Sequence, residues 1–182
     1  MNIGILVGSL RQESYNRKVA MTLIQLAPSS LKMELIEIGQ LPFFNQDIEA
    51  APPSSWTLFR QKLKNIDGFI LVTPEYNRSF PAVLKNALDV GSRPYGENLW
   101  DNKPCAVVSA SIGAIGGFGA NHHLRQCLAY LNAPCLAQPE IYLSFVDKFF
   151  DEKGNMTNDA TRAFLGKFLD AFTVWVQKIK KS

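Results

Sequence analysis

A chain of 182 residues, 47% hydrophobic and 19% charged, has the composition of an ordinary globular protein, and its length predicts one domain over residues 1–182. The formal net charge of +3 is modest and no basic stripe carries interleaved aromatic residues, so nucleic-acid binding is not expected. No apolar stretch approaches the roughly 20 residues that cross a bilayer, and residues 1–8 lack the pattern of a signal peptide, so we expect a cytoplasmic protein without membrane insertion.

Apolar runs and helical periodicities alternate along the chain. The sequence predicts strands near 2–8, 33–38, 68–73, 104–110 and 134–142, and helices near 15–27, 54–65, 81–91, 117–131 and 158–180. Strands that alternate with helices indicate a parallel sheet joined by right-handed crossovers, with helices on both faces. Five of each predict a flavodoxin-like α/β three-layer sandwich with strand order 2-1-3-4-5.

The segment between the first strand and the first helix has the features of an anion site. Gly8-Ser9-Leu10-Arg11 leads to Ser14 and Asn16 at the start of the helix. The unpaired amides and dipole of a helix N-terminus attract an anion, and hydroxyls with one guanidinium complete a cradle. The loop lacks the Gly-Lys-Ser/Thr end of a nucleoside-triphosphate loop and the three glycines of a dinucleotide loop. Two interpretations remain: an ordinary capped turn, or a site for one terminal phosphomonoester. Asn16 is expected either to cap the helix or to touch the phosphate.

Two later strands end in loops of similar character. Pro74-Glu75-Tyr76-Asn77 follows the third strand, with Ser79 as the expected cap and Pro81 in the first turn of the next helix. Residues 111–117 (SIGAIGG) follow the fourth strand. Because the carboxyl ends of parallel strands share one edge of the sheet, the three loops are expected to meet and to form a ligand site.

These loops resemble the signatures of the NAD(P)H-dependent FMN reductase family and are most similar to its quinone- and chromate-reducing bacterial flavoproteins. The similarity continues through residues 92–96 (SRPYG) and 123–126 (HLRQ) to Gln138-Pro139-Glu140, so it covers about residues 1–145. It implies FMN as the cofactor, NADPH or NADH as the electron donor, a quinone as the acceptor, and a homodimer or homotetramer.

The resemblance also implies which residues hold the cofactor. Those expected to bind FMN are Ser9, Arg11, Ser14, Tyr15 and Asn16 in the phosphate loop, Pro74, Glu75, Tyr76 and Asn77 beside the ring, and Ser109, Ile112 and Gly113 in the opposing loop. Backbone amides in the two ring loops can stabilise the charge of the reduced flavin. For Glu75 we favour a local cap or salt bridge for the carboxylate, with only its amide at the ring. Tyr76 is expected either beside the ring or at a subunit contact.

The chemistry that follows needs no acid or base from the protein. Hydride transfer from a nicotinamide to flavin N5 depends on stacking and alignment, so we expect no catalytic side chain. The expected enzyme is a ping-pong NAD(P)H oxidoreductase that reduces quinones and, promiscuously, azo compounds, free flavin or chromate. Arg17, Arg78 and Arg93 are all candidates for a 2′-phosphate contact, so the sequence does not decide between NADPH and NADH.

Two other functions remain open from the sequence. A flavodoxin-type one-electron carrier with tightly bound FMN shares the fold, but such carriers are usually strongly acidic and sandwich the flavin between aromatic rings, whereas this chain is basic. A non-catalytic sensor of a phosphate-bearing ligand is the third possibility. The long segments 39–53 and 93–102 are expected to border the pocket or to contact another subunit.

Neither the cysteines nor the histidines form a recognisable metal or redox motif. Cys105, Cys127 and Cys135 are widely spaced without a Cys-x-x-Cys pair, and we expect three reduced core residues. His122 and His123 are adjacent and therefore point to different sides of a helix, so we expect no metal site.

Overall fold

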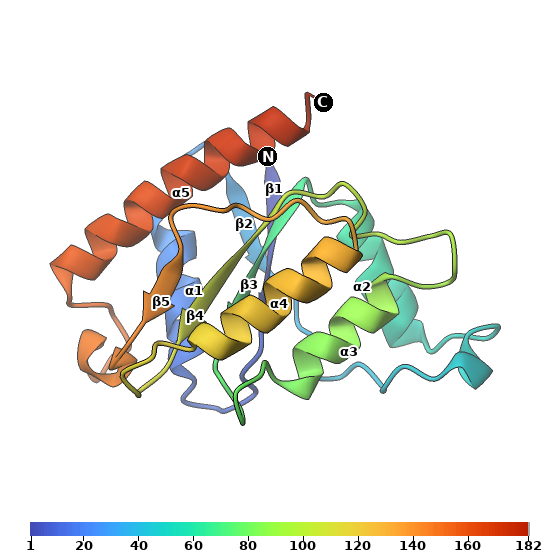
Figure 1. Cartoon of the computed structure of the whole chain (residues 1–182), viewed down its shortest axis with the longest axis horizontal. Helices are drawn as coiled ribbons and strands as arrows, with labels where there is room; N and C mark the ends of the chain where they lie inside the picture. Colours follow the sequence, from blue (N-terminus) through green and yellow to red (C-terminus); the bar gives the residue numbers. More distant parts are fainter. Residues whose placement is uncertain (182) are drawn as a thin grey trace.

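Five short segments form a parallel β-sheet in the order β2-β1-β3-β4-β5. The strands are β1 (Asn2–Val7), β2 (Lys32–Leu35), β3 (Gly68–Thr73), β4 (Cys105–Ala110) and β5 (Ile141–Leu143). Every residue of β3 and β4 is buried, which explains why these strands are continuous apolar runs in the sequence. The computed structural model in Figure 1 describes residues 1–181.

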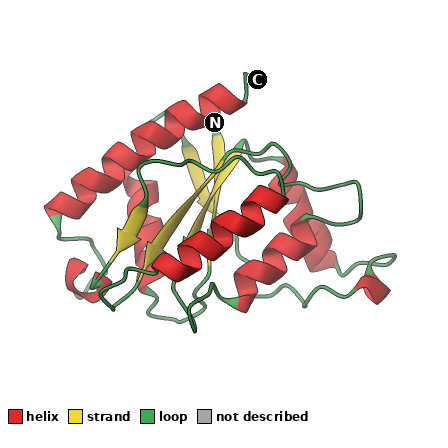
Figure 2. Ribbon diagram, viewed as in Figure 1, coloured by secondary structure: helices red, strands yellow, loops and turns green. Residues whose placement is uncertain are grey.

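Five α-helices cover the two faces of this sheet (Figures 1 and 2). They are α1 (Tyr15–Leu26), α2 (Ser54–Lys64), α3 (Ala82–Gly91), α4 (Phe118–Tyr130) and α5 (Asp159–Ile179), with short 3-10 helices η1 (Gln46–Ile48) and η2 (Val146–Phe149). Helices α1 and α5 contribute to one buried cluster, and α2, α3 and α4 to the other. The predicted flavodoxin-like α/β sandwich is therefore confirmed, strand order included.

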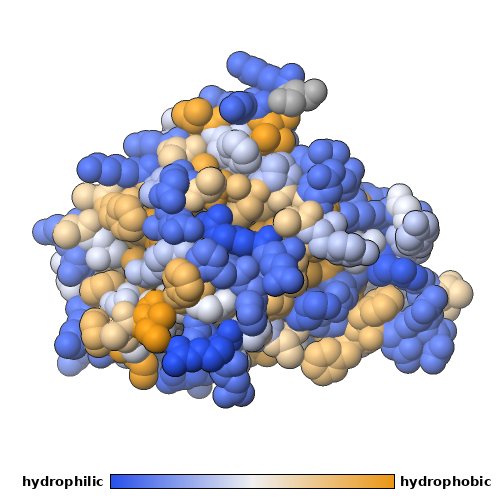
Figure 3. All heavy atoms as spheres, in the orientation of Figure 1, coloured by the Kyte–Doolittle hydropathy of each residue, from blue (hydrophilic) through white to orange (hydrophobic). Residues whose placement is uncertain are grey.

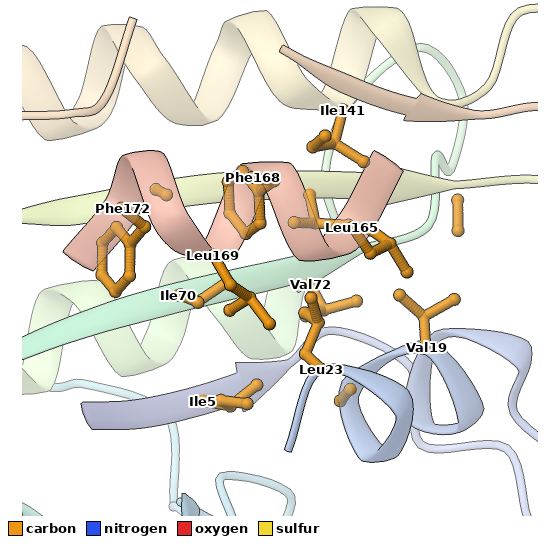
Figure 4. Close-up of a cluster of buried hydrophobic side chains, with 14 of the residues drawn as sticks. Ile5, Val19, Leu23, Ile70, Val72, Ile141, Leu165, Phe168, Leu169 and Phe172 are labelled. Carbon is orange, nitrogen blue, oxygen red and sulfur yellow. The ribbon is translucent and has the colours of Figure 1, made fainter. Parts of the chain in front are cut away.

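Helix α5 shows how the periodicity of the sequence builds one of these clusters. Its buried residues Leu165, Phe168, Leu169 and Phe172 recur at helical spacing and face Ile70 of β3 in Figure 4. Burying one side chain of this size contributes about 1.5–3 kcal/mol. The apolar stripe therefore fixes the long C-terminal helix against one face of the sheet.

The fifth strand is shorter than the sequence indicates. Only residues 141–143 pair with β4, whereas a strand was expected from residue 134. Cys135 makes a single parallel bridge to Cys105, and the ladder then stops. Pro134 and Pro139 have no N–H to donate, so an apolar and β-prone composition does not produce a continuous strand here. The other strands and helices end within three residues of their predicted bounds.

Within residues 1–181, the structure contains no helix that combines the length and the apolar character needed to cross a membrane. Figure 3 shows polar residues over much of one face, with apolar residues interspersed among them, including several near the lower edge. In Figure 1 the loops that follow the strands lie at this edge, and they carry exposed Leu10, Tyr76, Ile112 and Ile115.

Candidate functional site

Three loops meet at the carboxyl edge of the sheet, at the bottom of Figure 1. They are the β1–α1 loop (residues 8–14), the β3–α3 loop (74–81) and the β4–α4 loop (111–117). Together with the starts of neighbouring elements they enclose a pocket of about 200 Å³. Its lining residues are Ser9, Arg11, Ser14, Tyr15, Asn16, Pro74, Glu75, Tyr76, Ala110, Ser111, Ile112 and Val146. Nine of the twelve residues expected to bind FMN are in this lining, and Asn77, Ser109 and Gly113 are not.

The β1–α1 loop ends in a side-chain cap. Ser14 Oγ accepts a hydrogen bond from Arg17 N at 3.1 Å, and Ser14 O accepts one from Lys18 N. The cap of α1 is therefore Ser14, and the alternative that Asn16 caps the helix is wrong, because Asn16 lies inside the first turn.

Asn16, a residue of the pocket lining, instead carries an unpaired side-chain acceptor. Its side chain is only 5% exposed, and Nδ2 donates to Ala110 O at 3.3 Å. The carbonyl can only accept, so this contact orients the amide and leaves Oδ1 buried, with no partner in the described part of the chain. A buried acceptor without a donor is costly. A ligand hydroxyl would satisfy it, whereas a phosphate dianion would not.

Arg11 is the guanidinium in this pocket that the fold leaves available. It is exposed, and no hydrogen bond or ion pair joins it to another of residues 1–181. Arg17 differs, because it contacts Glu37 at 2.7 Å, a hydrogen bond that raises the pKa of Arg17. Arg93 is likewise engaged by Glu49 through two hydrogen bonds of 2.7 and 2.8 Å. Of these three arginines, Arg11 is therefore the one placed to meet an anion in the pocket.

The β3–α3 loop folds into a tight turn that exposes Asn77 and Arg78. Tyr76 and Ser79 exchange backbone hydrogen bonds of 2.8 and 3.0 Å, and the two residues between them have φ of 50° and 65°. A left-handed backbone is unfavourable for residues with a Cβ, though less so for asparagine than for most. Ser79 does not cap α3 as expected, since its Oγ lies 3.1 Å from His123 Nδ1 and Pro81 occupies the cap position without a side-chain bond.

The carboxylate of Glu75 links this loop to α4. Its Oε2 accepts a hydrogen bond from Ala120 N at 3.2 Å, and Oε1 contacts Arg78 Nη1 at 3.3 Å. The N-cap residue of helix α4 is Gly117, which has no side chain to accept a hydrogen bond, so Glu75 supplies a negative cap from another loop. A Cβ at Gly119 would lie 3.0 Å from Glu75 Oε2, so glycine permits this close approach. The side chain thus makes the expected local salt bridge, whereas the helix that it caps is distant in the sequence.

The β4–α4 loop offers fewer free groups than its composition indicates. Ser109 is fully buried, donates to Ile141 O at 3.2 Å and accepts from Asn121 Nδ2 at 3.3 Å. Gly113 N donates to Ser111 Oγ at 3.1 Å. The Ser109 side chain therefore stabilises the base of the loop, outside the pocket lining. Ala110 and Ile112 take part in the lining instead.

Three residues, Ala110, Ser111 and Val146, line the pocket although they are not among those expected to bind FMN. Val146 comes from η2, which follows the short fifth strand and has no motif that marks it. Ser111 belongs to the serine- and glycine-rich loop, and its hydroxyl was the available signal. The long segments 39–53 and 93–102 contribute nothing to this lining.

A larger groove, of about 680 Å³, lies between α3 and α4. Lys85, His123 and Cys127 are part of its lining, but the Lys85 ammonium is paired with Asp89. We place the ligand site in the smaller pocket because Arg11 and Asn16, whose side chains carry unpaired polar groups, belong to its lining. Nowhere in residues 1–181 do three or more His, Cys, Asp or Glu side chains form a group that could hold a metal ion.

Comparison with known proteins identifies the same family that the loops resemble. Residues 1–148 match the family model described as NADPH-dependent FMN reductase. A quinone reductase of Pseudomonas putida is 56% identical over 177 residues, which cover 97% of this chain and 95% of that protein. A 2-hydroxy-1,4-benzoquinone reductase of a Burkholderia species is 42% identical, with 97% of both chains covered.

Solved structures agree on the fold. The structure of FerB, a flavoenzyme NAD(P)H:(acceptor) oxidoreductase from Paracoccus denitrificans, superimposes with a TM-score of 0.92 at 37% identity, covering 97% of each chain. A point mutant of flavodoxin from Pseudomonas aeruginosa gives a TM-score of 0.56 at 16% identity, with 94% of this chain and 99% of that chain covered, and shows the fold alone.

Proposed function

The chain belongs to the NADPH-dependent FMN reductase family, and on this premise we propose that it is an FMN-dependent NAD(P)H oxidoreductase that reduces quinones. The named activities of the Pseudomonas and Burkholderia relatives support the acceptor class. When bound, FMN supplies hydride chemistry, taking two electrons from a nicotinamide and passing them to an acceptor in a separate half-reaction.

One observation carries the proposal: the pocket holds an unpaired cation and an unpaired buried acceptor. The exposed guanidinium of Arg11 suits a phosphate, and Oδ1 of Asn16 suits a hydroxyl. A phosphate carried on a hydroxylated chain satisfies both, and FMN has this structure. Ser9 and Ser14 add hydroxyls to the same lining, and the first turn of α1 adds backbone amides.

The rim of the pocket suits a flat apolar ring that must stay accessible. Tyr76 and Ile112 are 48% and 63% exposed, one from each of the loops expected to flank the ring. An open rim lets a nicotinamide and then an acceptor reach the same place, which is the requirement of a ping-pong cycle. The Glu75 carboxylate caps α4, and we propose that Arg11 binds the phosphate, so we propose no catalytic acid or base from the pocket.

An open rim also discriminates weakly between flat acceptors. We therefore propose azo compounds, free flavin and chromate as secondary acceptors. We propose either NADPH or NADH as the electron donor. Of the arginines that are candidates for a 2′-phosphate contact, Arg17 and Arg93 are paired with glutamates. The Arg78 side chain is 75% exposed and makes one 3.3 Å contact. If NADPH is preferred, Arg78 is the residue to test.

Assembly as a homodimer or homotetramer is part of the proposal. Tyr130 is exposed beside the groove between α3 and α4, where a second subunit could bury it. Light scattering on the purified protein measures this directly, and a monomeric mass would remove that part of the proposal.

The test of the activity is anaerobic addition of NADPH, then NADH, to protein reconstituted with FMN and desalted. We expect the flavin absorbance to bleach quickly and a quinone to restore it. Retained flavin that neither nucleotide bleaches would favour an electron carrier. A protein that retains no flavin would contradict the FMN site itself.

A further inference from the structure

Two of the three cysteines lie side by side although thirty positions separate them in the sequence. Cys105 opens β4, and Cys135 lies in the segment before β5, where the two form a parallel β-bridge. Cys105 N donates to Pro134 O at 3.0 Å, and Leu136 N donates to Cys105 O at 2.8 Å. Both cysteines are free thiols.

This pairing is compatible with a covalent bond between the sulfurs. Adjacent strands lie about 4.8 Å apart, and bridge partners direct their side chains to the same face. A disulfide accommodates Cα separations of roughly 4.4–6.8 Å. Each thiol donates only a long hydrogen bond to a neighbouring backbone oxygen, Cys105 Sγ to Ala133 O at 3.7 Å and Cys135 Sγ to Leu136 O at 3.8 Å. No large backbone movement is needed to join them.

The two thiols differ in the way that a redox pair requires. The Cys105 thiol, which can donate to an ionised Cys135, and the nearby Arg125 charge lower the pKa of Cys135, whereas burial raises the pKa of Cys105. Cys135 is half-buried and Cys105 is fully buried. Cys135 is therefore the less buried and more acidic of the two cysteines.

Arg125 is held so that its charge stays at the sulfur. Its Nη1 lies 3.5 Å from Cys135 Sγ and donates to Leu136 O at 2.9 Å, while Nε donates to Asn121 Oδ1 at 2.9 Å. No carboxylate forms a salt bridge with Arg125 in the described part of the chain. The guanidinium charge thus stabilises a thiolate instead of a neighbouring acid.

We propose that Cys135 and Cys105 form an oxidisable thiol pair, a modification site in which Cys135 reacts with a hydroperoxide and Cys105 then closes a disulfide. In the first step the Cys135 thiolate attacks one peroxide oxygen, an S–O bond forms, the O–O bond breaks, and the alkoxide or hydroxide leaves with a proton. In the second step the Cys105 sulfur attacks Cys135, the S–S bond forms, and the S–O bond breaks to release water. Two thiols are oxidised and one hydroperoxide is reduced.

The site does not depend on the proposed flavin chemistry. Cys105 is at the amino end of β4, whereas the pocket is built around Ala110 at its other end. Cys127 provides an internal control, because it lies on α4 without a thiol neighbour and burial raises its pKa.

The experiment uses the whole reduced protein, treated with hydrogen peroxide under native conditions and then alkylated. Before alkylation we expect the intact mass to fall by two hydrogens. After alkylation we expect a non-reduced peptide map to link Cys105 to Cys135, and dithiothreitol added before the alkylation should reverse both changes. Cys127→Ser should behave as the parent protein. Thiols that all remain free, or a link that involves Cys127, would overturn the proposal.

Single variants test the order of the two steps. Cys105→Ser should accumulate a sulfenic acid on Cys135 that a dimedone reagent labels, whereas Cys135→Ser should leave Cys105 unmodified. Equal reactivity of both variants would contradict the assigned roles. Arg125→Gln should slow alkylation of Cys135 several-fold near neutral pH, and Arg125→Lys should restore part of the rate. If Cys105→Ser fails to fold, the peptide map of the parent protein still decides whether the disulfide forms.

Discussion

The β1–α1 loop and the β3–α3 loop both follow central strands and both border the pocket, but they use their polar groups in opposite ways. In the first, Arg11 is exposed without a partner in residues 1–181, and Asn16 Oδ1, just beyond the loop in the first turn of α1, is buried without one. In the second, Glu75 is occupied by Ala120 and Arg78, and Ser79 by His123.

This difference indicates different roles for the two loops in ligand binding. Unpaired polar atoms that line a pocket gain from a ligand, whereas atoms already satisfied by the fold gain little. The β1–α1 loop is therefore expected to bind through its side chains. The β3–α3 loop is expected to contribute shape and backbone, with its side chains holding it in place. Substitutions in the two loops should then separate into losses of affinity and losses of stability.

The largest effect is expected from Arg11→Ala. Loss of a charge-assisted contact should weaken FMN binding by about 1–3 kcal/mol, measured by quenching of flavin fluorescence. Arg17→Ala is the matched control, because it removes a nearby guanidinium that is already paired with Glu37. Its FMN affinity should stay close to that of the parent protein. Equal affinity in Arg11→Ala and the parent would remove Arg11 from the site.

Asn16→Ala should come next, with a weakening of about 1 kcal/mol through loss of one hydrogen-bond acceptor. Riboflavin distinguishes the two residues, because it keeps the hydroxylated chain and lacks the phosphate. Asn16→Ala should weaken FMN and riboflavin alike, whereas Arg11→Ala should weaken FMN alone. A loss confined to FMN in Asn16→Ala would place this residue at the phosphate and not at a hydroxyl.

Much of this arrangement can be predicted from the sequence, for identifiable reasons. Strands β3 and β4 are buried on both faces, so each is a continuous apolar run in the sequence. The buried apolar residues of α5, such as Phe168, recur at helical spacing. The loops at the carboxyl edge follow directly from those strands. Arg11 is recognisable because it is the one basic residue in the short loop of residues 8–14.

Long-range partners are what the sequence does not reveal. Glu75 caps helix α4 through the backbone amide of Ala120, forty-five positions later in the sequence. No rule of sequence spacing predicts a contact between these two residues. Ser109 has a hydroxyl in the right strand, but its burial against Asn121 depends on how α4 packs. The segment from residue 134 is β-prone in composition, yet its prolines limit pairing to one bridge at Cys135. In each case tertiary contacts decide the role, and local pattern does not.

Glu75→Ala is expected to act mainly on stability. Loss of the cap on α4 should lower the free energy of unfolding by about 0.5–2 kcal/mol, measured by urea denaturation. Glu75→Gln keeps an oxygen that can accept from Ala120 N and loses only an ion pair with the exposed Arg78, so it should recover most of that loss. FMN affinity should change less than in Arg11→Ala. Lost flavin binding at unchanged stability would assign the carboxylate to the ligand and remove the contrast between the loops.

The smallest effect is expected from Tyr76→Phe. The ring of Tyr76 is 48% exposed at the rim, and no hydrogen bond is formed by its hydroxyl in the structure of residues 1–181. If this loop contributes shape, removing the hydroxyl should change FMN affinity by less than about 0.5 kcal/mol. Tyr76→Ala, which removes the apolar surface itself, should cost more than Tyr76→Phe in the same titration. A large loss from Tyr76→Phe alone would show that the β3–α3 loop also binds through a polar side chain, and the division between the two loops would then fail.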